Sequence, residues 1–274
     1  MPELPEVETV ARCLRPAIIG RTVTACRLRA PGLVRYPDPE SFVAELPGHH
    51  FAGVGRRGKY LILPDPSGRW LVVHLGMTGQ LSPASPLDPE PDHLHLILDL
   101  DDGGQLRYRD PRRFGRLLLG TEAELLTSGT MPALGPEPLD PTFRAADLAR
   151  RLHGRTAPIK ALLLDQGIVA GVGNIYADEA LFRARVRPTR AAGSLSIDAV
   201  RRLRRAIGEI IAEAIERRGS TVRDYRDSLG REGQFQERLL VYGRAGEPCA
   251  RCSRPLSLTR IAGRSAVFCR YCQR

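Results

Sequence analysis

The sequence predicts an α+β protein with an N-terminal antiparallel β-sandwich and flanking helices, then a helical region and a four-cysteine module. Three observations support this class. Residues 22–110 contain many short apolar stretches between turn residues, without the alternation of strands and helices that a parallel sheet requires. Residues 142–218 instead place apolar side chains at helical spacing. Two Cys-x-x-Cys pairs lie near the C-terminal end.

Composition and charge indicate which kind of molecule the protein binds. The 274 residues are 42% hydrophobic and 26% charged, as in an ordinary globular protein large enough for two domains. No apolar run approaches the ~20 residues that span a bilayer, and no signal peptide opens the chain, so we expect no membrane partner. The net charge is +10, but residues 1–141 carry 15 basic and 18 acidic side chains, whereas residues 142–274 carry 26 and 13. A polyanion is therefore expected to contact mainly the second half.

Apolar spacing and turn residues predict the elements in order. A helix follows the N-terminus, because Val7, Val10, Leu14 and Ile18 would share one face. A β-rich region follows, with strands near 22–28, 60–63, 70–75, 94–100 and 105–110. Helices are expected near 142–153, 156–166, 174–184 and 196–218. The predicted domains are 1–130, a Pro- and Gly-rich linker 131–141, a helical domain 142–240 with a mobile polar loop 219–238, and a ribbon 241–274.

The first six residues, Met-Pro-Glu-Leu-Pro-Glu, contain the most reactive candidate group. If Met1 is removed, Pro2 presents a secondary amine, and an α-amino group titrates near ~7.7–8.0. Such an amine attacks a sugar carbon to give an iminium, while Glu3 or Glu6 moves protons. The structural alternative is a helix N-terminus, where proline and glutamate are also favoured.

Cysteine spacing predicts a metal centre. Cys249, Cys252, Cys269 and Cys272 form two Cys-x-x-Cys pairs separated by 16 residues, which suits tetrahedral binding of one structural Zn²⁺. Disulfides are disfavoured in a reducing compartment, and sulfur ligands alone do not exclude iron.

Lysine is scarce, with 39 Arg but only Lys59 and Lys160. Each of these two lysines either occupies a position that needs a flexible or titratable charge, or has no functional reason to differ from arginine. Lys59 lies in Gly-Val-Gly-Arg-Arg-Gly-Lys-Tyr, which matches nucleotide-binding loops in part. A β pattern follows instead of the helix that such loops need, so we reject a nucleotide site and expect a tight basic turn.

Three further stretches carry candidate nucleic-acid contacts. Asn174 ends Gly-Val-Gly-Asn, where glycines permit close phosphate approach and Asn174 caps a helix, unless the stretch is a plain helical corner. Met77 and Phe114 leave strands on short loops, so they either wedge between bases or belong to the core. Arg112 can hydrogen-bond an orphaned base. We expect His93 to face DNA or form a hydrogen bond rather than bind metal.

Taken together, these motifs resemble the bacterial formamidopyrimidine-DNA glycosylases over the whole chain. The motifs are the N-terminal Met-Pro-Glu-Leu-Pro-Glu-Val-Glu-Thr, Arg-Gly-Lys-Tyr-Leu, His-Leu-Gly-Met-Thr-Gly, Asp-Pro-Arg-Arg-Phe-Gly, Gly-Val-Gly-Asn-Ile-Tyr, Val-Tyr-Gly-Arg and the four cysteines. The resemblance implies a helix–two-turn–helix domain with a zinc ribbon and DNA between two domains. It also implies a monomeric, cytoplasmic, nucleoid-associated base-excision-repair enzyme that acts on double-stranded DNA containing oxidised purines or abasic sites.

The resemblance also implies residue roles. Pro2 would form the Schiff base at C1′, Glu3 would be the acid/base, Glu6 would support the site, Lys59 would assist β-elimination and Arg264 δ-elimination. Met77, Arg112 and Phe114 would fill the void left by the flipped base. The other DNA contacts implied are His93, Arg155, Lys160, Asn174 and Tyr242.

Two alternatives remain open from the sequence. The first is an enzyme of the same superfamily that acts on oxidised pyrimidines, like endonuclease VIII. Met77 together with Arg112 and Phe114 favours the purine branch. The second is a zinc-ribbon protein that binds DNA without catalysis, which would retain Met1 and form no covalent adduct.

Overall fold

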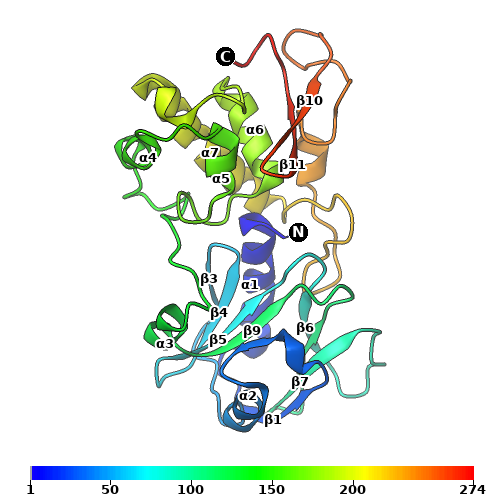
Figure 1. Cartoon of the computed structure of the whole chain (residues 1–274). Coiled ribbons are helices and arrows are strands. Elements are labelled where there is room, and N and C mark those ends of the chain that lie inside the picture. The colour runs from blue at the N-terminus through cyan, green and yellow to red at the C-terminus, as the bar shows by residue number, and fades with distance from the viewer. Residues whose placement is uncertain (1) are drawn as a thin grey trace. The chain divides into compact units, whose positions relative to one another are not determined.

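The chain forms two compact units in the computed structural model, which describes residues 2–274 (Figure 1). Unit 1 contains the residues up to Ala133 together with Arg218–Gln234, and unit 2 contains Leu134–Arg217 and Phe235–Arg274. The segment Arg218–Gln234, which we expected as part of the helical domain, therefore packs within unit 1. The predicted removal of Met1 concerns a residue outside those that the structure describes.

Unit 1 is built on two β-sheets, one of five strands in the order β2-β9-β5-β4-β3 and one of four in the order β1-β7-β8-β6. Neighbouring strands are antiparallel except for the parallel pair β2 and β9. The strands are β1 (Val23–Leu28), β2 (Val34–Tyr36), β3 (Gly55–Arg57), β4 (Tyr60–Pro64), β5 (Arg69–His74), β6 (Gln80–Ala84), β7 (Leu94–Leu100), β8 (Gln105–Arg109) and β9 (Arg116–Thr121). The helical elements are α1 (Leu4–Ile18), η1 (Pro31–Leu33), α2 (Pro39–Glu45) and α3 (Glu122–Thr127).

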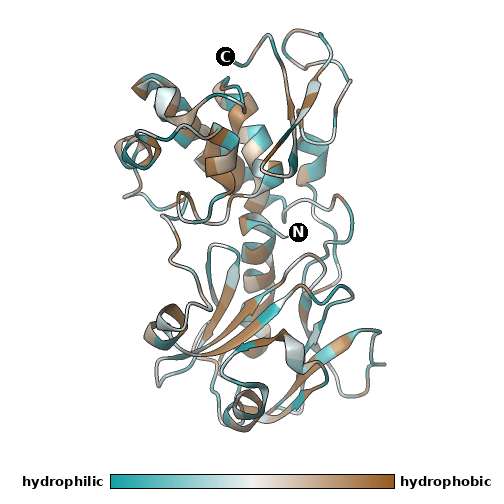
Figure 2. Cartoon of the chain, in the orientation of Figure 1, coloured by the Kyte–Doolittle hydropathy of each residue, from teal (hydrophilic) through white to brown (hydrophobic). Residues whose placement is uncertain are grey.

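A single hydrophobic core joins α1 to both sheets. The helix contacts β3 and β4 of one sheet and β6 of the other. Its predicted apolar face, including Val10 and Leu14, is buried together with Leu63 from β4 and Leu98 from β7. Figure 2 shows hydrophobic residues concentrated along the strands. The predicted α+β class with two packed sheets is confirmed, and the pairing is antiparallel as predicted except between β2 and β9.

Helix α3 lies within the predicted domain 1–130, shortly before the expected linker 131–141. Thr121 caps it, because its backbone N–H donates to Glu124 Oε2 at 2.7 Å and its side chain accepts from the Glu124 N–H at 3.3 Å. This Thr-x-x-Glu capping box is a recognised sequence signal for a helix start, which apolar spacing alone does not reveal. The boundary between the units accordingly falls after Ala133.

Unit 2 contains the helices that the apolar spacing predicted. They are α4 (Ala145–Leu152), α5 (Ile159–Leu164), α6 (Asn174–Ala184) and α7 (Ile197–Glu216), with short 3₁₀ turns η2 (Ala192–Ser194) and η3 (Phe235–Arg238). Ser196 caps α7 by accepting the N–H of Ala199 at 3.3 Å. Helix α6 packs on α5 and α7, and α4 also contacts α7. None of the helices among the described residues combines the length and apolarity needed to cross a membrane.

The C-terminal ribbon is a two-stranded hairpin of β10 (Ser257–Ile261) and β11 (Arg264–Phe268). Strand β11 packs against α6. Side chains of α6 and of the C-terminal region form one small buried hydrophobic cluster, which contains Phe182, Val241, Cys249, Leu256, Val267 and Cys269. The cluster is too small to be a core by itself, so the ribbon depends on α6 and on its cysteines.

Candidate functional site

The two N-terminal carboxylates lie buried at the start of α1. Pro2 is buried, Glu3 is 3% exposed at the N-cap position, and Glu6 is 1% exposed in the first helical turn. The backbone N–H of Glu3 donates to Glu6 Oε2 at 2.8 Å. Glu6 thus fixes the backbone that directly follows Pro2, and the helix N-terminus favours both negative charges.

Glu6 also holds the segment Arg218–Gln234, which belongs to the same unit. The Oε1 atom of Glu6 accepts the backbone N–H of Ser220 at 2.7 Å, and the backbone carbonyl of Glu6 accepts the Tyr225 hydroxyl at 3.3 Å. A Cβ at Gly219, where φ is +77°, would lie 2.6 Å from Glu6 Oε1, so glycine is required there. Burial, and secondarily the Glu6 charge, raise the pKa of Tyr225 above its ordinary value.

Lys59 occupies the tight turn between β3 and β4. Arg57 pairs with Tyr60, which leaves Gly58 at φ +56° and Lys59 as the two turn residues. The glycine-rich stretch therefore leads into strand β4, as predicted, and not into the helix that a nucleotide-binding loop needs. Lys59 is only 6% exposed, and α1 contacts both strands of this hairpin.

His74 lies against the same hairpin. Its ring is 4.8 Å from that of Tyr60, and its Nδ1 accepts the N–H of Gly76 at 3.2 Å. Burial, together with the positive charges of Lys59 and Arg116, lowers the pKa of His74 to about 4. The imidazole is consequently neutral near pH 7 and adds no charge beside Lys59.

Surface loops of unit 1 carry the expected void-filling side chains. Phe114 is 53% exposed, and the Arg112 guanidinium lies 5.0 Å from the centre of its ring. Met77 is partly exposed in the turn after β5, and His93 is exposed with φ at +62°. The alternative that Phe114 belongs to the core is thus wrong, because half of its side chain is in contact with solvent.

In unit 2, the start of α6 and the tip of the ribbon come together. Asn174 is the first residue of α6, and Gly173, not Asn174, is the N-cap; the expected capping role is therefore wrong by one position. Asn174 Nδ2 donates to Ser265 Oγ at 3.3 Å, and Ser265 follows Arg264 on β11. Arg264 is exposed beside the turn Ala262–Gly263.

Lys160 is buried, whereas the expected DNA contact would require its side chain at the surface. The side chain is 0% exposed, and its Nζ donates to Asp178 Oδ1 at 2.6 Å and to the backbone carbonyl of Ser265. Asp178 Oδ2 accepts the N–H of Val267 at 3.1 Å. Burial raises the pKa of Asp178 to about 6, against the opposing effect of Lys160. A fully buried ammonium presents no charge to a phosphate, so the expectation of a direct DNA contact is wrong in this arrangement.

Glu179, which we had not singled out, positions the Tyr242 segment. Its carboxylate accepts the successive backbone N–H groups of Leu240, Val241 and Tyr242 at 2.8–3.1 Å. Burial raises the pKa of Glu179, and these hydrogen bonds oppose that rise. Two adjacent acids inside a helix segment that is otherwise apolar, Ile175–Phe182, are the sequence signal that could have indicated such a role. Arg155 is exposed in the turn after α4, as expected for a surface contact.

The four cysteines converge as a metal centre. Their Sγ atoms all lie within 4.8 Å of one another, with Cys252 to Cys269 at 3.5 Å and Cys249 to Cys272 at 4.0 Å. Tetrahedral zinc with Zn–S bonds of ~2.3 Å requires sulfurs about 3.8 Å apart, so the thiolates fit the ion. Backbone N–H groups of Arg251 and Cys272 also point at Sγ atoms, both at 3.4 Å.

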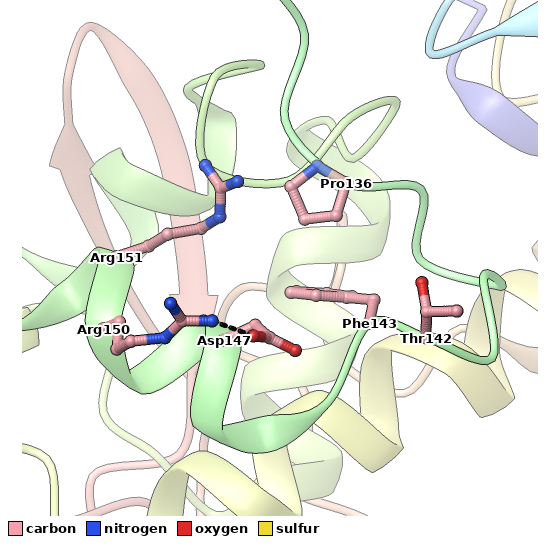
Figure 3. Close-up of a pocket in the computed structure, with 6 residues that line it drawn as sticks. All are labelled: Pro136, Thr142, Phe143, Asp147, Arg150 and Arg151. Atoms are coloured by element: carbon pink, nitrogen blue, oxygen red, sulfur yellow. Dashed lines mark hydrogen bonds and ion pairs between the residues drawn. The ribbon is translucent and has the colours of Figure 1, made fainter.

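A pocket of about 400 Å³ in unit 2 contains none of the candidate residues (Figure 3). It is lined by Pro136, Thr142, Phe143, Asp147, Arg150 and Arg151. The only carboxylate there, Asp147, forms an ion pair with Arg150. Because Arg151 also donates to the Gly167 carbonyl at 3.0 Å, the polar groups of this pocket serve the fold.

Family models match three parts of the chain. They are the formamidopyrimidine-DNA glycosylase N-terminal domain at residues 1–117, the formamidopyrimidine-DNA glycosylase H2TH domain at 134–226, and the zinc finger found in FPG and IleRS at 246–274.

Individual proteins match over the full length. The formamidopyrimidine-DNA glycosylase of Symbiobacterium thermophilum is 49% identical over 274 residues, which are 100% of this chain and 89% of that protein. The crystal structure of the MutM (Fpg) protein from Thermus thermophilus has a TM-score of 0.88 at 46% identity and covers 99% of this chain and 98% of its own. Lactococcus lactis Fpg in complex with DNA containing an abasic site has a TM-score of 0.91 at 37% identity, with 99% of each chain covered.

The sheets, the H2TH helices and the four-thiolate ribbon define a DNA glycosylase that carries a structural zinc ion. Within that class, the chain belongs to the formamidopyrimidine-DNA glycosylase family. The Cys249, Cys252, Cys269 and Cys272 thiolates hold the single zinc ion of the zinc finger.

Proposed function

We propose that the protein removes oxidised purines, 8-oxoguanine and formamidopyrimidines, from double-stranded DNA and then cleaves the strand at the resulting abasic site. The observation that carries the proposal is the N-terminus, where Pro2 directly precedes the buried Glu3 and the Glu6 carboxylate fixes the backbone between them. The proposal requires that Met1 be removed, so that the Pro2 nitrogen becomes a free secondary amine.

The amine of Pro2 is the nucleophile. It attacks C1′ of the damaged nucleotide, the C1′–N bond breaks, and the base leaves with a proton. Ring opening gives an iminium between Pro2 and C1′, which has no N–H to lose and therefore persists as an electron sink. Glu3 moves the protons for attack and ring opening. Glu3 is only 3% exposed to solvent, which supports this role because a carboxyl group shielded from water exchanges protons with a bound substrate and not with the solvent.

Elimination then cleaves the strand. The iminium acidifies the C2′ proton, whose loss expels the 3′ phosphate by β-elimination, and a second elimination expels the 5′ phosphate. In the proposal Lys59 contacts phosphate and assists the first elimination. Arg264 binds phosphate and assists the second, and its exposure at the ribbon turn supports that role. The zinc ion supports the ribbon that carries Arg264.

A duplex base must leave the stack before C1′ becomes accessible, which costs a few kcal/mol. In the proposal Met77 and Phe114 fill the vacated space, and Arg112 faces the orphaned base. His93, Arg155, Asn174 and Tyr242 contact the DNA. The proposed setting is the bacterial chromosome in the cytoplasm, where the protein acts as a monomer.

Borohydride trapping tests this proposal. We expect the protein with Pro2 as its first residue to form a covalent adduct with a duplex containing 8-oxoguanine opposite cytosine, and to excise this base faster than thymine glycol. A variant with one extra residue ahead of Pro2 should lose the adduct and retain duplex affinity. A trapped adduct with the extended variant would contradict Pro2 as nucleophile, and preference for thymine glycol would assign the protein to the oxidised-pyrimidine branch.

A further inference from the structure

The buried carboxylate of Asp110 joins the loops that carry Met77, Arg112 and Phe114. Asp110 is 0% exposed, immediately after β8. Its Oδ1 accepts the Thr78 hydroxyl at 2.6 Å and the Arg112 N–H at 3.3 Å. Its Oδ2 accepts the Gly115 N–H at 2.8 Å and the Tyr108 hydroxyl at 3.4 Å. Oδ1 therefore joins the two loops, since Thr78 and Arg112 lie on different loops, while Oδ2 holds Gly115 and the strand residue Tyr108.

Thr78 closes a second link between the same loops. Its Oγ1 donates to Asp110 and also accepts the backbone N–H of Arg112 at 3.2 Å. Thr78 directly follows Met77, and Arg112 lies in the exposed run 111–114 that also contains Phe114. A movement of Met77 is consequently transmitted to Arg112 through one hydroxyl.

Close backbone packing makes this connection stiff. A Cβ at Gly76 would lie 2.5 Å from the backbone carbon of Phe114. Cβ atoms at Gly79 and Gly115 would lie 2.4 and 1.8 Å from the Tyr108 hydroxyl. The two loops therefore leave room only for glycine where they meet, and neither shifts without displacing the other.

The backbone of Asp110 extends the connection to the His93 turn. Its N–H donates to the His93 carbonyl at 3.1 Å, and its own carbonyl accepts from Arg113 N at 3.1 Å and lies 3.0 Å from His95 Nε2. One residue thus anchors every segment of unit 1 on which we expected a DNA-inserting side chain.

We propose that Asp110 and Thr78 are positioning residues that make the insertion of Met77, Arg112 and Phe114 a single concerted event and thereby set specificity for the base opposite the lesion. This inference rests on the proposed function. Neither residue is expected to touch DNA. If the loops are coupled, Arg112 reaches the orphaned base only when Met77 and Phe114 also fit, so an opposite base that Arg112 does not accept blocks insertion as a whole.

Substitutions at Thr78 test the coupling with little change of volume. Thr78→Val removes the hydroxyl, whereas Thr78→Ser retains it. Asp110→Asn is isosteric, but it places an amide donor against groups that are already donors. Loss of one buried hydrogen bond corresponds to about a 10-fold effect. Thr121→Val is the matched control, because it removes a similar threonine–carboxylate hydrogen bond, 2.9 Å to Glu124, away from these loops.

The measurement is single-turnover excision of 8-oxoguanine opposite cytosine and opposite adenine, with trapping on a preformed abasic site in parallel. We expect Thr78→Val and Asp110→Asn to lower the cytosine-to-adenine ratio by about 5-fold or more, given the size of a lost buried hydrogen bond. Trapping at the abasic site, where no base has to be expelled, should change by less than about 2-fold. Thr78→Ser and Thr121→Val should behave as wild type.

An unchanged cytosine-to-adenine ratio in Thr78→Val would overturn the coupling, as would equal impairment in Thr78→Ser or in Thr121→Val. A parallel loss of abasic-site trapping would indicate general disruption and would also overturn it. If Asp110→Asn does not fold, the comparison of Val and Ser at position 78 decides. Failure of the wild-type protein to trap any substrate would refute the proposed function itself, which is a different outcome.

Discussion

Glu6 and Ser220 are joined by a hydrogen bond of 2.7 Å although 214 residues separate them in the sequence. The same carboxylate accepts the N–H of Glu3. A single buried acid thus connects the segment that follows Pro2 to the loop that begins at Gly219. Ser220 belongs to the polar loop 219–238 that we expected to be mobile, so Glu6 ties this loop to the segment beside the proposed nucleophile.

Glu6→Gln should weaken this connection. The amide keeps one acceptor oxygen but turns an N–H₂ group toward a backbone N–H, which costs about 1–3 kcal/mol for the unsatisfied donors. We expect excision to fall about 10-fold and the Ser220 amide to exchange faster with deuterium. Glu8→Gln is the control on the same helix, since it removes the ion pairs of Glu8 with Arg12, Arg15 and Arg56 but leaves the hydrogen bond between Glu6 and Ser220 in place. Equal effects of the two variants would contradict the role of Glu6.

Lys160 and Asp178 provide a test of a buried ion pair. Lys160→Met leaves Asp178 without its cation and should lower the free energy of unfolding by about 3–5 kcal/mol. The double variant Lys160→Met/Asp178→Asn should recover part of that loss, because no buried charge then remains. Urea unfolding of the four proteins in the cycle measures the coupling. Additive losses would mean that the two side chains do not act as a pair.

Removal of zinc should release the ribbon. Cys249→Ser removes one thiolate ligand, and a strong chelator removes the ion itself. In either case the hairpin of β10 and β11 lacks a sufficient core. We expect metal content to fall from about one ion per chain to none, with loss of duplex binding. Cys26→Ser is the matched control, since Cys26 lies on β1 far along the chain from the ribbon. Unimpaired DNA binding by Cys249→Ser would show that the ribbon is dispensable.

His74 should make stability depend on pH in the acid range. Its pKa is lowered from 6.5 to about 4 by burial and by Lys59 and Arg116. Between these values the unfolded chain binds more protons than the folded one, so stability falls as the pH decreases from about 6.5 to 4, by up to about 3 kcal/mol. His74→Gln should show a shallower decline in urea unfolding across that window. An identical slope in both proteins would exclude His74 as the cause.

Local patterns were sufficient to predict much of the fold. Helix α1 and the helices of unit 2 follow from apolar spacing, and the metal centre follows from cysteine spacing. Those signals repeat over short distances. Helix α6 spans the predicted residues 174–184, but its N-cap is Gly173 and not Asn174, because glycine and asparagine both suit that position.

Other features depend on contacts between distant residues. Nothing near Tyr225 indicates that it joins the core beside α1, since its partners lie at the other end of the chain. Lys160 was notable in the sequence only because lysine is scarce, and the buried Asp178 explains its position. Asp110 was noticed as part of a motif, but its role as acceptor for two loops required their spatial arrangement.

The discontinuity of unit 1 has a consequence for synthesis on the ribosome. The strands up to Ala133 emerge first, yet Tyr225, one of the side chains in their common interior, is translated only after helices α4 to α7. The N-terminal part of unit 1 therefore lacks part of its core while residues Leu134–Arg217 of unit 2 are synthesised. Closure of the core of unit 1 thus depends on a segment translated after α7, and the C-terminal ribbon of unit 2 is translated later still.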